Sequence, residues 1–220
     1  MFLASQLIQT NYPAINLQDK ISFALQLMED YDVQHLPVVS DDKFVGLISK
    51  DDLLDADETL TIISLEESLN KFFVKNEEYF LAALKIIANN QLSLIPVINE
   101  QQELSGVITQ SKLLQTLNVY TGSNEPGGLI IFELDKRQYS FGEISRLVET
   151  NDAYITQLNT YTEPETGLVL VAVKINKTEI SDIVATFQRY DYNVRFYFGE
   201  EQYANELKDN YNHLMSYLNI

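Results

Sequence analysis

Residues 35–54 read HLPVVSDDKFVGLISKDDLL, and residues 94–114 repeat the phrase as LIPVINEQQELSGVITQSKLL. In both stretches an apolar run contains a proline and a polar turn follows. A glycine then precedes two apolar residues, a hydroxyl residue and the start of a leucine-ended helix. Pro37 and Pro96 are 59 positions apart. The chain therefore contains an internal repeat of about sixty residues, a period typical of stacked or paired structural units.

The repeat extends upstream with helical spacing. One apolar stripe returns 59 positions later: Ile21, Ala24, Leu25 and Met28 become Phe80, Ala83, Leu84 and Ile87. Each copy therefore predicts a short opening helix, a short strand, an amphipathic helix, two strands joined by a polar turn, and a closing helix. Because the paired strands are apolar at nearly every residue, we expect both of their faces to be covered. A unit this short leaves apolar surface open, and packing against its twin would close the core.

The two copies match at their proline, glycine (Gly46 and Gly106) and hydroxyl positions, and both also contain the predicted amphipathic helix. This combination resembles a tandem pair of CBS motifs, the regulatory module also called a Bateman module. The resemblance covers about residues 1–120, with the first motif at residues 1–58 and the second at residues 59–120. It implies a regulatory protein that binds an adenosine-containing ligand such as AMP, ADP, ATP or S-adenosylmethionine.

The resemblance also implies which residues would hold this ligand. In CBS motifs, the stretch after the glycine, with a hydroxyl residue and an aspartate, holds the ribose, and a residue two positions before the proline faces the phosphates. The first copy has His35, Ser49 and Asp52 at these places, and the second has Leu94, Thr109 and Lys112. A carboxylate accepts from both ribose hydroxyls, whereas lysine only donates. We therefore expect one complete pocket in the first copy, with Thr109 and Lys112 as candidates for a second, anion-binding site.

The same residues also have a purely structural interpretation. A hydroxyl before a helix and an acid three positions later, as in Ser49 and Asp52, approach a capping box, and the acid favours the helix N-terminus. Both roles can hold together, because helix N-termini also attract anions. A lone histidine such as His35 is often only a satisfied surface or core residue.

Residues 51–55 read DDLLD, which matches the aspartate-rich motif of magnesium-dependent prenyl diphosphate enzymes. Two of these aspartates would share one helix face, as a divalent metal requires. The second copy reads SKLLQ at the same place. We therefore interpret the stretch as an acidic helix start and keep a magnesium-linked sensor as a minor alternative.

A linker composition at residues 121–128 separates the repeat from a different pattern. Residues 129–200 predict the order β-α-β-β-α-β of a ferredoxin-like unit, with helices over residues 140–150 and 178–190. After paired CBS motifs, this unit resembles an ACT domain, an arrangement similar to acetoin-utilisation regulators. Amino-acid-binding ACT domains usually have a glycine in the first strand-helix loop, whereas here the first glycine is Gly142. We therefore expect dimerisation rather than amino-acid binding.

The last segment, residues 201–220, predicts an amphipathic helix that packs on its own domain or on a partner chain. Its apolar side chains at helical spacing are Tyr203, Leu207, Tyr211, Leu214 and Leu218.

The composition narrows the possible partners. The chain has 32 acidic and 15 basic residues and a net charge of −17, which disfavours nucleic acid and acidic membrane surfaces. It has no cysteine, which excludes disulfides and thiolate metal sites. The N-terminus lacks the basic region of a signal peptide, and the longest apolar run, residues 168–173, is too short to span a bilayer. These features predict a soluble cytoplasmic protein.

No nucleophile, base and orienting group stand out together, and no glycine-rich phosphate loop is present. We therefore expect neither catalytic residues nor a catalytic cofactor or metal. The sequence predicts an α+β, homodimeric sensor of an adenine nucleotide that acts on an unknown target protein. The alternative is an interaction scaffold that dimerises and docks without binding a ligand.

Overall fold

The structure, a computed structural model, describes residues 2–200 and divides into two compact units, Met1–Asn118 and Val119–Ile220. The helix predicted within residues 201–220 lies outside the described residues. In the part of the chain that the structure describes, no helix is long and apolar enough to cross a membrane.

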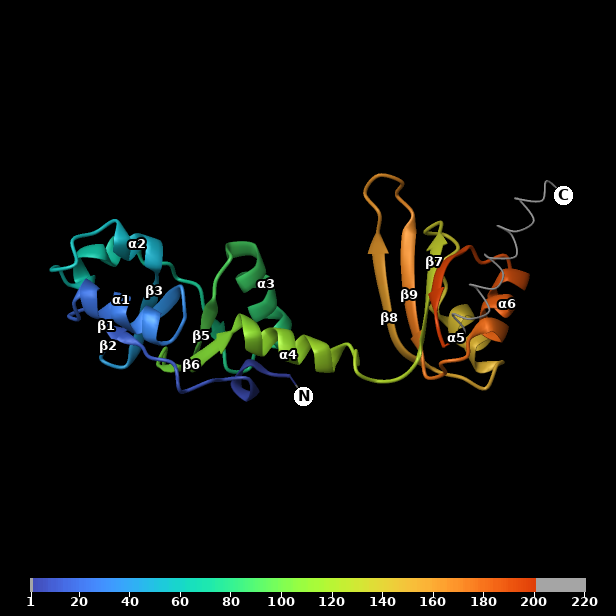
Figure 1. Cartoon of the computed structure of the whole chain (residues 1–220), viewed down its shortest axis with the longest axis horizontal. Helices are drawn as coiled ribbons and strands as arrows, with labels where there is room; N and C mark the ends of the chain where they lie inside the picture. The colour runs from blue at the N-terminus through green and yellow to red at the C-terminus, as the bar shows by residue number, and fades with distance from the viewer. Residues whose placement is uncertain (1, 201–220) are drawn as a thin grey trace, which may run out of the picture. The chain divides into compact units, whose positions relative to one another are not determined.

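Both copies of the repeat fold in the predicted order (Figure 1). The elements of the first copy are η1 (Ala4–Gln6), β1 (Ile15–Asn16), α1 (Ile21–Asp30), β2 (His35–Ser40), β3 (Lys43–Ser49) and α2 (Lys50–Leu54). Those of the second copy are η2 (Ile62–Ser68), β4 (Val74–Lys75), α3 (Phe80–Asn90), β5 (Leu94–Ile98), β6 (Leu104–Thr109) and α4 (Gln110–Tyr120). In each copy the short first strand runs parallel to the second strand, which pairs antiparallel with the third.

One hydrophobic core joins the two copies. The predicted stripes on α1 and α3 both point into it, and Met28 and Phe80 are almost completely buried there. All five residues of β5 are buried, as expected for a strand that is covered on both faces. The prediction that each copy closes its core against its twin is therefore confirmed.

The opening segments of the two copies are exchanged: each packs on the other copy. They contain Ile8 and Gln9 in the first copy and Leu69 and Asn70 in the second. Gln9, in the first copy, forms two backbone hydrogen bonds with Val107 of the second copy, at 2.8 and 3.1 Å. Asn70, in the second copy, forms the corresponding pair with Leu47 of the first copy, at 2.8 and 2.9 Å. The sequence predicts an opening helix in each copy, but it does not show that this segment packs on the other copy.

The exchange explains the repeated glycines. A Cβ atom on Gly46 would lie 2.6 Å from Cβ of Leu69, and one on Gly106 would lie 2.5 Å from Cγ2 of Ile8. Each glycine thus lies where the opening segment from the other copy crosses the sheet. Gly106 also has a φ of +143°, which L-residues rarely adopt.

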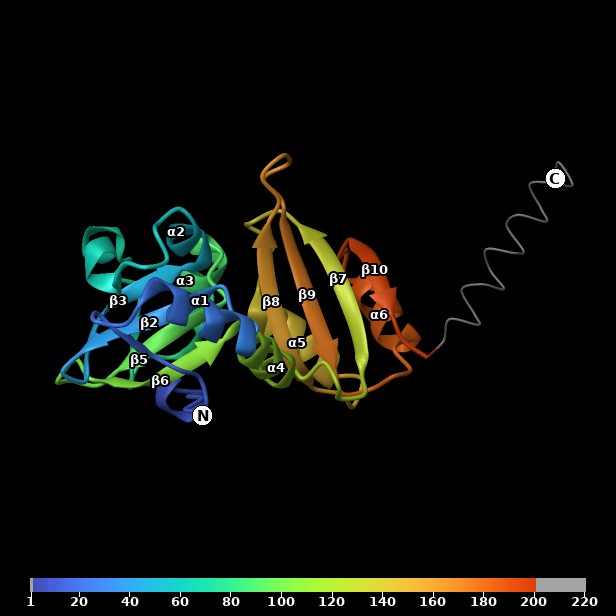
Figure 2. The same cartoon turned by 60° about the vertical axis from the view of Figure 1, so that its left-hand side comes forward.

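The C-terminal unit has the predicted ferredoxin-like fold (Figure 2). Its elements are β7 (Gly128–Leu134), α5 (Phe141–Glu149), β8 (Ile155–Thr162), β9 (Val169–Ile175), α6 (Ser181–Arg189) and β10 (Val194–Phe198). The four strands form an antiparallel sheet in the order β10-β7-β9-β8. Helices α5 and α6 pack on one face, where alternate residues of β7 and β9 are buried.

Helix α6 begins at Ser181, three residues later than the sequence predicts. The carbonyl of Lys177 accepts a hydrogen bond from Gly128 N–H, and that of Thr178 accepts one from Glu200 N–H. These carbonyls bond to the neighbouring chain segments, so the helix starts only after them. Apolar periodicity alone does not reveal such backbone pairing.

The other face of this sheet is also apolar. The register places six apolar side chains on it, namely Leu129, Ile131, Leu170, Ala172, Phe196 and Phe198. The two phenylalanines are each 52% exposed. The charged side chains on the same face have partners within the unit: Glu133 pairs with Arg195 at 3.3 Å, and the ammonium of Lys174 donates to the Gly122 carbonyl.

Candidate ligand site in the N-terminal unit

The first-copy trio consists of His35, Ser49 and Asp52. These residues come together at one end of the β2–β3 hairpin. The register places His35 opposite Ser49, and α2 begins at the residue after Ser49. Asp52 is the third residue of this helix, so its carboxylate turns back toward Ser49. All three residues are partly exposed and therefore accessible to a ligand.

Ser49 and Asp52 form the predicted capping box. The N–H and hydroxyl of Ser49 donate to Oδ2 of Asp52 at 3.3 and 2.5 Å, and Asp52 N–H donates to Ser49 Oγ at 3.2 Å. Within residues 2–200, no hydrogen bond reaches the second carboxylate oxygen, Oδ1. The capping interaction thus leaves one anionic oxygen of Asp52 able to accept from a ligand hydroxyl.

His35 connects the first copy to the second. Its Nδ1 accepts from Ser93 N–H at 3.2 Å and lies 3.1 Å from Ser93 Oγ, which itself accepts from Gln34 N–H at 3.1 Å. Because Nδ1 is an acceptor, the proton of the neutral ring is on Nε2. Burial lowers the pKa of His35, and the charges of Asp52 and Asp51 partly oppose this shift. At neutral pH the ring therefore offers a hydrogen-bond donor rather than a positive charge.

The corresponding positions of the second copy are arranged differently. Leu94 is fully buried, and Thr109 is only 6% exposed. The Thr109 hydroxyl donates to Oε1 of Gln9 at 2.7 Å, and its N–H approaches the same oxygen at 3.4 Å. Lys112 N–H donates to Thr109 Oγ1 at 3.2 Å, so Thr109 caps α4 as Ser49 caps α2. Ser93 and Gln9 are the residues that the sequence did not indicate; Gln9 lies 100 positions away from Thr109.

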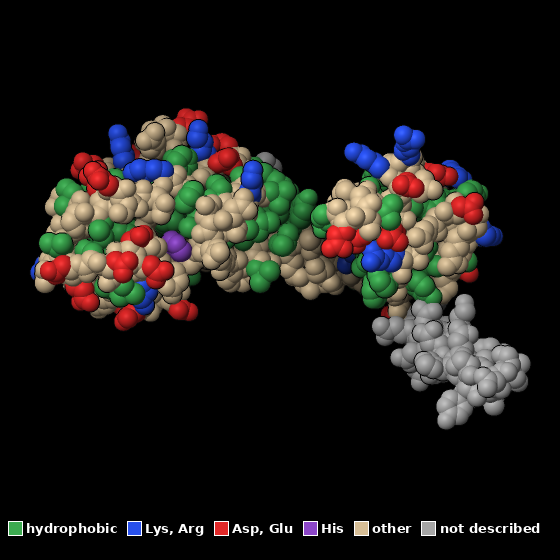
Figure 3. All heavy atoms as spheres, turned by 90° about the horizontal axis from the view of Figure 1, so that it is seen from above, with side chains coloured by type: hydrophobic (Ala, Val, Ile, Leu, Met, Phe, Trp, Pro, Cys, Tyr) green, Lys and Arg blue, Asp and Glu red, His purple; other side chains and the backbone are tan. Residues whose placement is uncertain are grey.

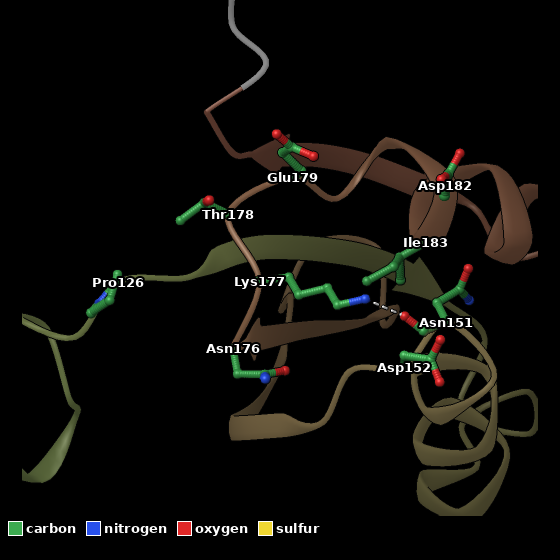
Figure 4. A pocket seen from close by; sticks show the side chains of 9 residues that line it. All are labelled: Pro126, Asn151, Asp152, Asn176, Lys177, Thr178, Glu179, Asp182 and Ile183. Carbon is green, nitrogen blue, oxygen red and sulfur yellow. Dashed lines mark hydrogen bonds between the residues drawn. The ribbon is translucent and has the colours of Figure 1, made fainter.

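The C-terminal unit has a hollow of about 760 Å³ that the sequence did not predict (Figure 4). It carries three exposed carboxylates, those of Asp152, Glu179 and Asp182. The ammonium of Lys177 already donates to the Asn151 carbonyl at 2.6 Å. This charge balance disfavours a phosphate or carboxylate ligand, so the hollow is a poorer nucleotide site than the first-copy trio.

Acidic side chains occur on both units, as Figure 3 shows for one face. In the described part of the chain, no group of three or more histidine, aspartate or glutamate side chains is placed to hold a metal ion. The aspartates of residues 51–55 instead lie at the start and end of α2, where Asp51 and Asp52 occupy the first turn. The two first-turn positions are favourable for acids because of the helix dipole.

The lowered pKa of His35 predicts a pH-dependent stability. A histidine that folds in its neutral form contributes stability fully above its ordinary pKa of 6.5, and this contribution is lost as the pH falls below that value. We expect the urea midpoint to fall more between about pH 7.5 and about pH 5.5 in the wild type than in His35→Leu, which carries the residue of the second copy. Equal pH dependence of the two proteins would contradict the burial of His35 as a neutral ring.

Comparisons with known proteins agree with this architecture. A model of the CBS domain family matches residues 4–59 and 69–118. Homoserine O-acetyltransferase of Methanosalsum zhilinae is 32% identical over 104 residues, which cover 45% of this chain and 21% of that protein. Inosine-5'-monophosphate dehydrogenase of Methanocaldococcus jannaschii is 20% identical over 147 residues, 66% of this chain and 30% of that protein. The chain thus spans less than a third of either relative.

Among solved structures, a CBS domain pair/ACT domain protein of Thermotoga maritima is similar with a TM-score of 0.50. It is 22% identical, and the match covers 54% of this chain and 98% of that chain. At this level of identity the similarity concerns the fold.

Proposed function

The N-terminal unit of this chain is a tandem pair of CBS domains, and we propose that this pair senses an adenosine-containing nucleotide and signals by a change of conformation or assembly. The observation that supports the proposal is the free Oδ1 oxygen of Asp52 beside the accessible Ser49 and His35. A carboxylate acceptor suits the ribose diol, and the Nε2–H donor of His35 suits a phosphate oxygen.

The contact between His35 and Ser93 suggests how binding would be transmitted. His35 belongs to the first copy and Ser93 to the second, so a phosphate that draws the imidazole away weakens a link between the copies. A ligand shifts a conformational equilibrium only by its differential affinity for the two states. We propose that breaking this link supplies the difference.

The acidic surface bears on the identity of the ligand. With a net charge of −17, the chain repels a polyphosphate, and Lys50 beside the trio is itself 3.8 Å from Glu29. We therefore favour AMP or ADP over ATP, unless magnesium accompanies ATP. S-adenosylmethionine, which carries no phosphate, is the remaining candidate.

A thermal-shift screen of AMP, ADP, ATP and S-adenosylmethionine, with and without magnesium, tests the proposal. A ligand present at about a hundred times its Kd stabilises the folded state by about 2.7 kcal/mol and raises the melting temperature by several degrees. If no ligand in the screen stabilises the protein, the sensor function is wrong. A shift by ATP that depends on magnesium would support the magnesium-linked alternative.

The second candidate is a scaffold that binds no ligand. It is favoured by the capping box, which gives Ser49 and Asp52 a structural role without any nucleotide.

Both relatives named above are enzymes, but this chain spans only 30% and 21% of their lengths. We propose that the chain itself is regulatory and not catalytic, and that it acts on another protein in the cytoplasm.

We further propose that two copies pair through the open apolar face of the C-terminal sheet. This face carries little net charge, because its strand residues Glu133 and Lys174 have opposite charges, whereas the chain as a whole is strongly acidic. Like-charged copies can approach where the net charge is low, and a two-fold axis makes one patch complementary to itself. Light scattering at micromolar concentration is expected to give twice the mass of 25.2 kDa.

The double variant Phe196→Glu/Phe198→Glu is expected to be monomeric, because two exposed rings become four buried charges in each dimer. The matched control is Phe141→Glu/Tyr190→Glu, which changes two exposed aromatic residues at the start of α5 and the end of α6, the helices that cover the opposite face. A monomeric wild type, or a dimer that survives the first double variant, would contradict this interface.

A further inference from the structure

Gln9 occupies the place in the second copy where a ligand would meet the hydroxyl residue. Its Oε1 accepts the Thr109 hydroxyl at 2.7 Å and lies 3.4 Å from the Thr109 N–H. Both donors of Thr109 are therefore turned toward a side chain of the same protein. Thr109 is 6% exposed, whereas Ser49 in the first copy is partly exposed.

Within residues 2–200, the first copy has no equivalent of this contact. The position that corresponds to Gln9 is Asn70, because Asn70 pairs with Leu47 as Gln9 pairs with Val107, 60 residues further along. The Asn70 residue is exposed, and its hydrogen bonds are the two backbone bonds to Leu47. The Ser49 hydroxyl instead bonds within its own motif to Asp52.

A ligand at the second copy would have to displace the Gln9 amide before it could use Thr109. Exchanging one hydrogen bond for another brings little net free energy, whereas any donor left unpaired costs about 1–3 kcal/mol. Replacing Lys112 by an acceptor therefore does not suffice to open this position.

We propose that Gln9 is a specificity-determining residue that keeps the second copy closed to the nucleotide, so that the chain binds its ligand only at the first-copy trio. The inference rests on the proposed function and deepens it. Closure thus has two independent causes: Lys112 cannot accept from the ribose, and Gln9 already holds the Thr109 hydroxyl. The opening segment of one copy thereby controls access to the other.

Titration calorimetry with AMP tests this closure in three variants beside the wild type. Lys112→Asp gives the second copy the acceptor that Asp52 supplies in the first. Lys112→Asp/Gln9→Ala also removes the amide, while the backbone bonds of Gln9 to Val107 remain. Lys112→Asp/Asn70→Ala is the matched control, because it truncates the corresponding side chain of the other opening segment.

We expect about one AMP per chain for the wild type, for Lys112→Asp and for the Asn70→Ala control, and about two for Lys112→Asp/Gln9→Ala. Two AMP in Lys112→Asp alone, or one in the Gln9→Ala double variant, overturns the role of Gln9. Binding at the first copy serves as an internal check of folding, and its loss in the Gln9→Ala double variant would show that Gln9 is structural, which also overturns the inference. A wild type that binds no AMP, with heat absent in every variant, instead counts against the proposed function.

Discussion

Replacing Gly106 by alanine is expected to lower the free energy of unfolding of the N-terminal unit by about 3–5 kcal/mol. The new Cβ atom would lie 2.5 Å from Ile8 Cγ2 and 2.9 Å from the Gln9 carbonyl oxygen. The residue would also have to keep a φ of +143°, which is strained for alanine. Urea denaturation followed by circular dichroism measures the loss.

Gly142→Ala is the matched control for this substitution. A Cβ atom at Gly142 meets nothing within 4 Å, and the residue lies in the first turn of α5, where alanine is the better helix former. This variant is expected to be neutral or slightly stabilising. If Gly106→Ala were as stable as Gly142→Ala, the crossing of the opening segment over the second-copy sheet would be wrong.

Asp52→Ala is expected to weaken nucleotide binding by about ten- to a hundred-fold, which corresponds to about 1.5–3 kcal/mol for a lost charge-assisted hydrogen bond. It also removes the capping box, at a cost of about 1 kcal/mol of stability. Calorimetry gives the first effect and thermal unfolding gives the second, so the ligand role and the capping role are measured separately.

Lys112→Ala is the control in the second copy, because Lys112 is the third residue of α4 as Asp52 is of α2. It is expected to leave the affinity unchanged within about two-fold. An Asp52→Ala protein that melts earlier but binds the nucleotide as tightly as the wild type would leave Asp52 with a structural role only.

The sequence predicts the order of the elements in both units because apolar periodicity records which face of each element is buried. The repeat adds a second, independent copy of the same pattern, so the stripe on α1 and that on α3 support one another. The ferredoxin-like order follows in the same way from β7 to β10, where alternation along the strands indicates which side chains face the helices.

What the sequence does not show depends on backbone pairing between distant segments. The bonds of Gln9 to Val107 and of Asn70 to Leu47 exchange the opening segments, yet a repeat reads the same with or without exchange. The contact of His35 with Ser93 depends on how the two copies face each other, which no local spacing encodes. The capping box was visible because its residues are three positions apart.

Titration calorimetry of the wild type with AMP, beside Ser49→Ala and Thr109→Ala, measures how many nucleotides one chain binds and where. The first copy has accessible Ser49 and Asp52, whereas Thr109 is buried against Gln9. We predict a stoichiometry of about one AMP per chain, weaker binding in Ser49→Ala, and unchanged affinity in Thr109→Ala. A stoichiometry of about two, or equal losses in the two variants, would contradict a single nucleotide site in the first copy.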